Sequence, residues 1–218
     1  MIIVMVLSLI IQQTLQSRFE KYSKVGTANG MSGAEVAQKM LHENGIYDVK
    51  VVPAKGMLTD HYNPQTKTVA LSEGVYASRS VAAAAVAAHE CGHAVQHAKG
   101  YAPLKMRSAL VPVVSFASNI VQWVLLAGVL CINIFPNLLW IGIALFATTT
   151  LFSFITLPVE VNASSRAIAW LGRAGVTDSR THSMAIDALK WAAYTYVIAA
   201  LGSLATLLYY IGIARNRN

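Results

Sequence analysis

Three residues, His89, Glu90 and His93, form the pattern that most clearly predicts chemistry. Two histidines four positions apart on a helix project from one face, so their imidazole nitrogens can bind the same metal ion. Glu90 is rotated by about 100° from His89 and can reach a water molecule on that metal. Zinc lowers the pKa of its water towards about 7, and the glutamate then takes the proton as a carbonyl is attacked. The pattern predicts peptide-bond hydrolysis with one zinc ion per chain, and a helix with unrelated surface histidines is the alternative.

A catalytic zinc usually takes three protein ligands and leaves a fourth position for water. Glu160 is the first acid after Glu90 and therefore the expected third ligand. A glutamate that is only solvated at the end of a helix is the alternative. His97 competes for the same role, but it is turned about 40° from His93, so three histidines at this spacing converge poorly on a tetrahedral ion.

Other polar residues are weaker candidates for the same site. Arg166 follows Glu160 closely and could stabilise a developing oxyanion, or it could lie at lipid headgroups. Asp60 and His61 could pass beside the cleft or be solvated. Cys91 points away from the histidine face, which favours a structural thiol.

The composition indicates that lipid is part of the solvent. The 218 residues are 55% hydrophobic and only 12% charged, whereas a soluble domain has about 25% charged residues. The mean hydropathy is +0.49. The net charge of +7 is attributed to basic flanks facing anionic lipid, so nucleic-acid binding is not expected.

Two long stretches carry no Asp, Glu, Lys or Arg, namely Ser108 to Val159 and Trp191 to Ala214. A helix crosses about 30 Å of hydrocarbon with about 20 residues, so the first stretch is too long for one span. Pro136-Asn137 is a turn signal in its middle. We expect a helical hairpin, a third span in the second stretch, and an uncleaved N-terminal anchor.

The basic residues predict the orientation. Eleven of the 17 Lys and Arg residues lie between Gln12 and Leu110, and four lie between Pro158 and Lys190. Basic residues concentrate on the cytoplasmic side of membrane spans. With four spans the two segments share one side, which predicts an active site facing the cytoplasm.

The segment before the hairpin has the pattern of a small α+β domain. Ser32 with Glu35 forms a capping box for a helix that Asn44-Gly45 ends. Short strands are expected near residues 49–52, 58–62 and 68–71, followed by an alanine-rich helix that Ser80 caps and Gly100 stops. The predicted fold is a mainly α, polytopic membrane protein with about four transmembrane helices and this small cytoplasmic domain.

The expected organisation has five parts. They are an anchor at 1–17, a cytoplasmic segment with the histidine helix at 18–110, a transmembrane hairpin at 111–157, a cytoplasmic segment with the third ligand at 158–190, and a last transmembrane helix at 191–218.

Nearly the whole chain resembles the bacterial neutral zinc metallopeptidase family of membrane proteins, which is gluzincin-like. The resemblance is carried by the runs at 22–25, 58–62, 89–97, 100–104 and 157–164. It implies a bacterial cell-membrane peptidase with a zincin-like segment, with His89, His93 and Glu160 as zinc ligands and Glu90 as the base. Distantly similar membrane zincins have Asp where this chain has Ser164, which calls into question the contact that an acid makes there to a zinc-binding histidine.

The leading hypothesis is a membrane-embedded zinc metalloprotease (a hydrolase) whose partners are membrane lipid and a peptide or protein substrate. A site-2-type intramembrane protease is one alternative, although that class places its histidines within a membrane span. A non-catalytic, metal-stabilised scaffold is the other. The sequence specifies neither the substrate nor the oligomeric state.

Overall fold

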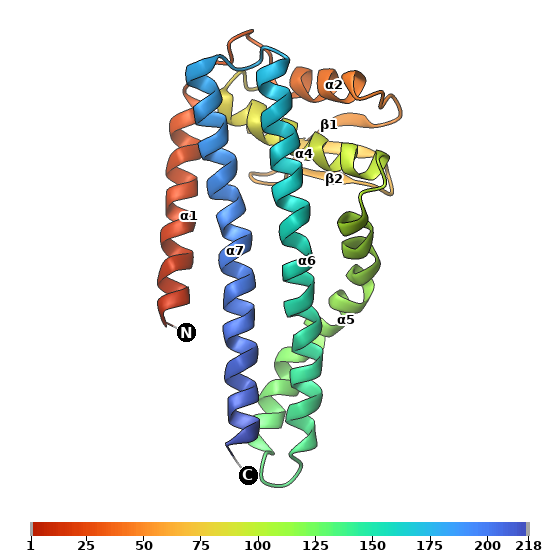
Figure 1. The fold of residues 1–218 in the computed structure, drawn as a ribbon, viewed down its shortest axis with the longest axis vertical. Helices are drawn as coiled ribbons and strands as arrows, with labels where there is room; N and C mark the ends of the chain where they lie inside the picture. The colour runs from red at the N-terminus through yellow and green to blue at the C-terminus, as the bar shows by residue number, and fades with distance from the viewer. Residues whose placement is uncertain (1, 217–218) are drawn as a thin grey trace.

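The structure is a computed structural model that describes residues 2–216, and it places a small domain at one end of a bundle of long helices (Figure 1). Among the described residues, four helices are long and apolar enough to cross a membrane: α1 (Ile2–Ser23), α5 (Ala102–Leu130), α6 (Asn137–Arg173) and α7 (Ser179–Arg215). The predicted mainly α fold with four spans is confirmed. Residue 1 of the expected anchor and residues 217–218 of the expected last segment lie outside the described residues.

The long helices extend well beyond the apolar runs that predicted them. The charged and polar part expected at 158–190 consists mostly of the end of α6 and the beginning of α7. Only a short connection separates the two helices, and Asp178 caps α7 by accepting hydrogen bonds from the backbone of Arg180 and Thr181. The length of an apolar run is set by the thickness of the hydrocarbon layer that it crosses. The helix itself can continue beyond that layer because its backbone hydrogen bonds are formed within the helix.

The hairpin of α5 and α6 is tight at its turn and open at the domain end. A Cβ atom on Gly128 would lie 2.7 Å from Cα of Leu139, and one on Gly142 would lie 2.9 Å from a methyl group of Leu125. The two helices therefore touch closely near the Pro136 turn. Towards the domain, α5 contains Pro112, and the first half of α5 stands away from α6 (Figure 1).

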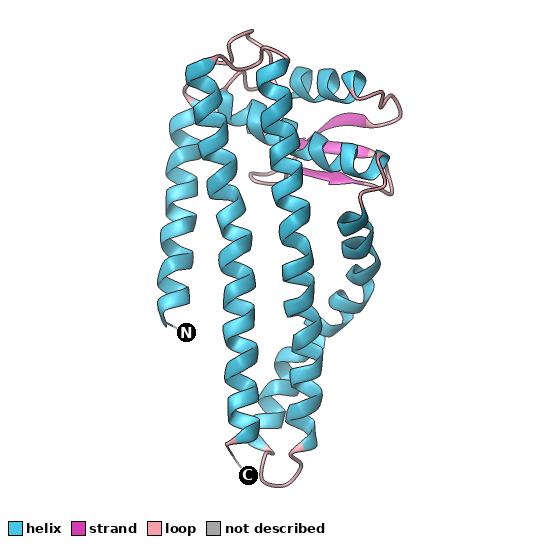
Figure 2. Ribbon diagram, viewed as in Figure 1, coloured by secondary structure: helices cyan, strands magenta, loops and turns pink. Residues whose placement is uncertain are grey.

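The small domain is built around a three-stranded sheet with α2 (Gly33–Glu43) beside it (Figure 2). The strands are β1 (Lys50–Ala54), β2 (His61–Asn63) and β3 (Thr68–Ser72), in the order β1-β3-β2. β1 is parallel to β3, and β2 is antiparallel to β3. The short helix α3 (Glu73–Tyr76) follows β3. β2 is therefore an edge strand of this sheet.

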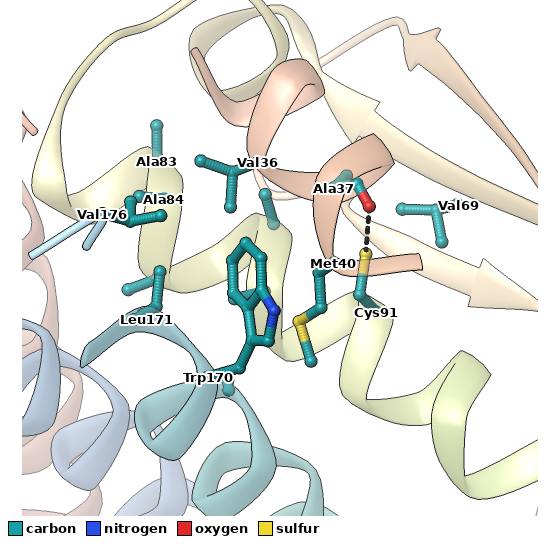
Figure 3. Close-up of a cluster of buried hydrophobic side chains, with 14 of the residues drawn as sticks. Val36, Ala37, Met40, Val69, Ala83, Ala84, Cys91, Trp170, Leu171 and Val176 are labelled. Atoms are coloured by element: carbon teal, nitrogen blue, oxygen red, sulfur yellow. Dashed lines mark hydrogen bonds between the residues drawn. The ribbon is translucent and has the colours of Figure 1, made fainter. Parts of the chain in front are cut away.

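The helix α4 (Val81–Ala98) carries the histidine motif and forms the centre of the core. The Ser80 hydroxyl accepts a hydrogen bond from the Ala83 backbone at its start, and Gly100, with a φ of +63°, follows its end. Its alanines pack against α2, the sheet and Trp170 of α6 (Figure 3). Trp170 is buried, and its indole nitrogen donates a hydrogen bond to Glu43 at 2.7 Å, which ties α6 to α2. The core thus fixes α4 against the end of α6.

Candidate metal centre

Residues that lie about seventy positions apart in the chain meet where α4 crosses α6. His89 Nε2 lies 3.2 Å from Glu160 Oε2, and His93 Nε2 lies 3.6 Å from the same oxygen. The two imidazole rings are nearly perpendicular, with centroids 4.8 Å apart. Glu160 is 3% exposed and His93 is 8% exposed. A buried carboxylate between two imidazoles needs a compensating positive charge.

The spacing of these groups fits a zinc ion. His89, His93 and Glu160 can each offer one ligand atom, with all three atoms within 4.8 Å of one another. In a tetrahedral zinc site with bonds of about 2.1 Å, neighbouring ligand atoms are about 3.4 Å apart. The observed separations of 3.2 and 3.6 Å lie on either side of that value. Two imidazoles and one carboxylate are also a ligand set of catalytic zinc.

One glycine allows the two helices to approach this closely. A Cβ atom on Gly92 would lie 2.6 Å from the carbonyl oxygen of Ala163 and 3.1 Å from its Cα atom. Such contacts would be with the backbone of α6 and not with a flexible side chain. Because Gly92 stands between His89 and His93 on α4, and Ala163 follows Glu160 on α6, the absence of a side chain here allows the three candidate ligands to lie close together.

The Nδ1 atoms of both histidines have polar partners, which leaves the Nε2 atoms directed at Glu160. Ser164 Oγ lies 3.0 Å from His89 Nδ1. Gln96 Oε1 lies 3.1 Å from His93 Nδ1. Gln96 is fully buried, and its amide nitrogen donates to the Val159 carbonyl at 2.7 Å. A serine therefore contacts His89 at the position where related zincins have Asp, and sequence reasoning gave no role to Gln96.

The electrostatics of His93 are dominated by the neighbouring acids. Burial alone would lower the pKa of His93, but the hydrogen bond and charge of Glu160, together with the charge of Glu90, outweigh it and raise the pKa above its usual value. The centre is therefore a site that attracts positive charge.

A cavity of about 500 Å³ opens beside the three candidate ligands. Its walls come from β2 and the turn after it, from α4, and from the spanning helices α5, α6 and α7. Glu90 lines this cavity next to His89 and His93. Tyr196 of α7 also lines it, so a tyrosine of an apolar helix faces the site. A peptide chain that entered here would meet the ligands and Glu90 together.

The arginine in this cavity is Arg107, not Arg166. Arg107 Nη1 lies 3.8 Å from Glu160 Oε1, and its buried Nε atom has no hydrogen-bond partner. Arg166 donates a hydrogen bond to Asn162 at 2.7 Å and is not among the residues that line the cavity. One sequence signal could have found Arg107, because it is the last charge before the long uncharged stretch and Glu160 is the first charge after it.

The remaining candidates lie around the site or outside it. His97 is exposed, and its Nδ1 atom lies 2.8 Å from the Tyr62 hydroxyl, so the structure places it with β2 and apart from the ligands. Asp60 lines the cavity, but its carboxylate accepts hydrogen bonds from the backbone and hydroxyl of Ser72. His61 also lines the cavity. Burial raises the pKa of the Cys91 thiol, which contacts the Ala37 carbonyl in the core (Figure 3).

The fold and this centre together define a polytopic helical protein with two histidines and one glutamate arranged as a metal site. A family model described as "Putative neutral zinc metallopeptidase" matches residues 1–215. A relative from Bacillus subtilis (strain 168), "Putative membrane protease YugP", is 46% identical over 205 residues, which cover 94% of this chain and 90% of the relative. The chain belongs to the neutral zinc metallopeptidase family. No solved structure matches it.

Proposed function

We propose that the chain is an integral-membrane zinc peptidase that hydrolyses peptide bonds at the cytoplasmic face of the bacterial cell membrane. The observation that carries the proposal is the set of three converging ligands, with both Nδ1 atoms held by other side chains and Glu90 in the adjoining cavity. His89, His93 and Glu160 would hold one zinc ion per chain.

When bound, zinc supplies an acidic water molecule and polarises the substrate carbonyl. Glu90 would accept a proton from the attacking water and pass it to the leaving amine. Ser164 and Gln96 keep the two histidines oriented. Arg107 donates to the substrate carbonyl oxygen as negative charge develops there, the role that the sequence had suggested for Arg166.

The cytoplasmic orientation is supported by the distribution of basic residues. The basic segments at 12–110 and 158–190 lie at the end of the bundle that carries the small domain (Figure 1). Lys and Arg favour the cytoplasmic side of membrane spans. This orientation can be tested with single cysteines introduced into the loop at 56–58. Cells with intact membranes are treated with an impermeant thiol reagent, and a cytoplasmic loop stays unlabelled.

Replacement of Glu90 by glutamine tests the enzymatic role. The purified Glu90→Gln protein is expected to keep one zinc ion and to lose cleavage of an unstructured peptide, since the amide cannot accept the proton. Glu73→Gln, a change of an exposed glutamate on α3, is the matched control and keeps both properties. Cleavage that survived in zinc-loaded Glu90→Gln would sink the assignment of the base. Full cellular function of Glu90→Gln would favour a metal-stabilised scaffold instead, and cleavage mapped inside membrane segments would favour a site-2-type enzyme.

A further inference from the structure

A polar face runs along α5, and beyond its first residue, Arg107, it has no hydrogen-bond partner among the described residues. It consists of Arg107, Ser108, Ser115, Ser118, Asn119 and Gln122, which we call the α5 polar stripe. At 100° per residue these six positions occupy about 120° of the helix circumference and extend over about 22 Å of its length. All but Arg107 lie within the charge-free stretch that predicted the hairpin.

Beyond Arg107, the side chains of the stripe are exposed and form no hydrogen bond, in contrast to polar residues of the neighbouring helix. Its serines, Asn119 and Gln122 are exposed and make no hydrogen bond to any described residue. In α6, the hydroxyl groups of Thr148, Thr149 and Ser153 bond to carbonyls of their own helix. Lipid tails offer no hydrogen bonds, so amide and hydroxyl groups that face them remain unpaired. The stripe therefore indicates a polar occupant in place of lipid.

The stripe is continuous with the candidate active site. Four residues of α5 line the cavity, namely Leu104, Arg107, Ser108 and Val111, and the same face of the helix carries the rest of the stripe deeper in the bundle. A second face of α5, next to the stripe, is used for packing, since its buried residues beyond Leu104 are Ala117, Val121, Leu125 and Gly128. Val111, Ser115 and Ser118 are exposed, so no described residue covers the face that leads out of the cavity.

We propose that the α5 polar stripe docks a transmembrane helix of a membrane-protein substrate and thereby delivers the adjoining cytoplasmic chain to the cavity. This inference rests on the proposed peptidase function. A substrate helix with serine, asparagine or glutamine on one face would pair with the stripe through interhelical hydrogen bonds. Its flanking segment would then extend past Arg107 towards Glu90, so tethering raises the local concentration of the cleavage site.

The first experiment compares two substrates in lipid nanodiscs. One is an unstructured peptide, and the other is the same peptide fused to a designed single-spanning helix with two asparagines on one face. Asn119→Leu/Gln122→Leu is expected to lower kcat/KM on the anchored peptide by about five- to tenfold and to leave the free peptide unchanged. Phe116→Leu/Trp123→Leu, on the exposed apolar face of α5 that adjoins the stripe, is the matched control and changes neither. Equal cleavage of the anchored peptide by both variants would overturn the docking while leaving the peptidase intact.

The second experiment does not depend on activity. In a Glu90→Gln/Cys131→Ser background, Asn119→Cys is expected to form a disulfide with a cysteine in the designed helix. Val113→Cys, an exposed position about 120° around α5 from Asn119, is not. Equal cross-linking at both positions would overturn the proposal. A self-association surface would replace the proposal under two conditions. Asn119→Cys would have to cross-link two copies of the chain, and the dimers of the unmodified protein would have to be lost in Asn119→Leu/Gln122→Leu. If the free peptide is not cleaved by the unmodified protein, the peptidase proposal fails and this cross-link still decides the docking.

Discussion

Replacing Gly92 with alanine is expected to disrupt the metal centre without touching any ligand. The added Cβ atom would lie 2.6 Å from the Ala163 carbonyl oxygen, where ordinary van der Waals contact begins at 3.4 Å. Both groups belong to helix backbones, so α4 and α6 must separate by roughly 0.8 Å at this point. Glu160 lies one turn before Ala163 on α6 and moves with it.

The size of this shift determines the expected loss of affinity. Zinc sites tolerate deviations of about 0.2 Å in ligand distances, and the required separation is several times larger. We expect zinc affinity to fall by at least about 100-fold, beyond the effect of losing one supporting hydrogen bond. Overpacking of this kind also lowers the free energy of unfolding by about 1–3 kcal/mol.

The assay is competition for zinc against a chelator, with thermal unfolding measured in parallel. Gly128→Ala is a control for close helix contact, because its Cβ atom would meet Leu139 at 2.7 Å near the other end of the hairpin. It is expected to lower stability while zinc affinity is kept. Gly212→Ala, which meets nothing within 4 Å, controls for the substitution itself. A Gly92→Ala protein that binds zinc as tightly as the unmodified chain would refute the reasoning.

Three further changes have separate readouts. Ser164→Ala removes the hydroxyl group that contacts His89 Nδ1. It is expected to weaken zinc binding about 10- to 100-fold in the same competition assay. Unchanged affinity would show that the serine is dispensable. Arg107→Gln is expected to lower kcat/KM by about 10²- to 10³-fold at full zinc occupancy, while Arg166→Gln has little effect, and the reverse order would assign the oxyanion role to Arg166. Hydrogen bonds lower the pKa of the Asp178 carboxyl group, and the largest effect comes from the bond that the Thr181 backbone donates. This cap therefore stabilises the fold above the unfolded-state pKa of about 4 and is lost as the pH falls through the lowered folded-state pKa. The melting temperature should fall less with acid in Asp178→Asn, and equal slopes would contradict the assignment.

The helices and strands of the small domain could be predicted because local signals mark them. Ser32 and Ser80 cap α2 and α4 as their spacing predicts, and Gly100 follows the end of α4. The spans could be predicted from the missing charges. The full lengths of α6 and α7 could not, because the apolar pattern ends where lipid ends and the helices continue into the domain.

The three candidate ligands could be predicted from the sequence, but most of the contacts around them could not. His89 and His93 follow from spacing on one helix, and Glu160 from its place after a long uncharged stretch. Arg107 reaches the site only through the approach of α5, and the hydrogen bond from Gln96, which lies three residues after His93 on α4, to Val159 depends on the crossing of α4 with α6. These contacts depend on tertiary packing at positions such as Gly92, which no local pattern in one sequence encodes.

X-ray absorption at the zinc edge of the purified, zinc-loaded protein tests the central claim most directly. The expected spectrum shows two imidazole nitrogens, one carboxylate oxygen and one further light atom, with no sulfur. It should be unchanged in His97→Ala and altered in Glu160→Gln. A spectrum with three imidazoles that loses one in His97→Ala, or one that Glu160→Gln leaves unchanged, would contradict the account.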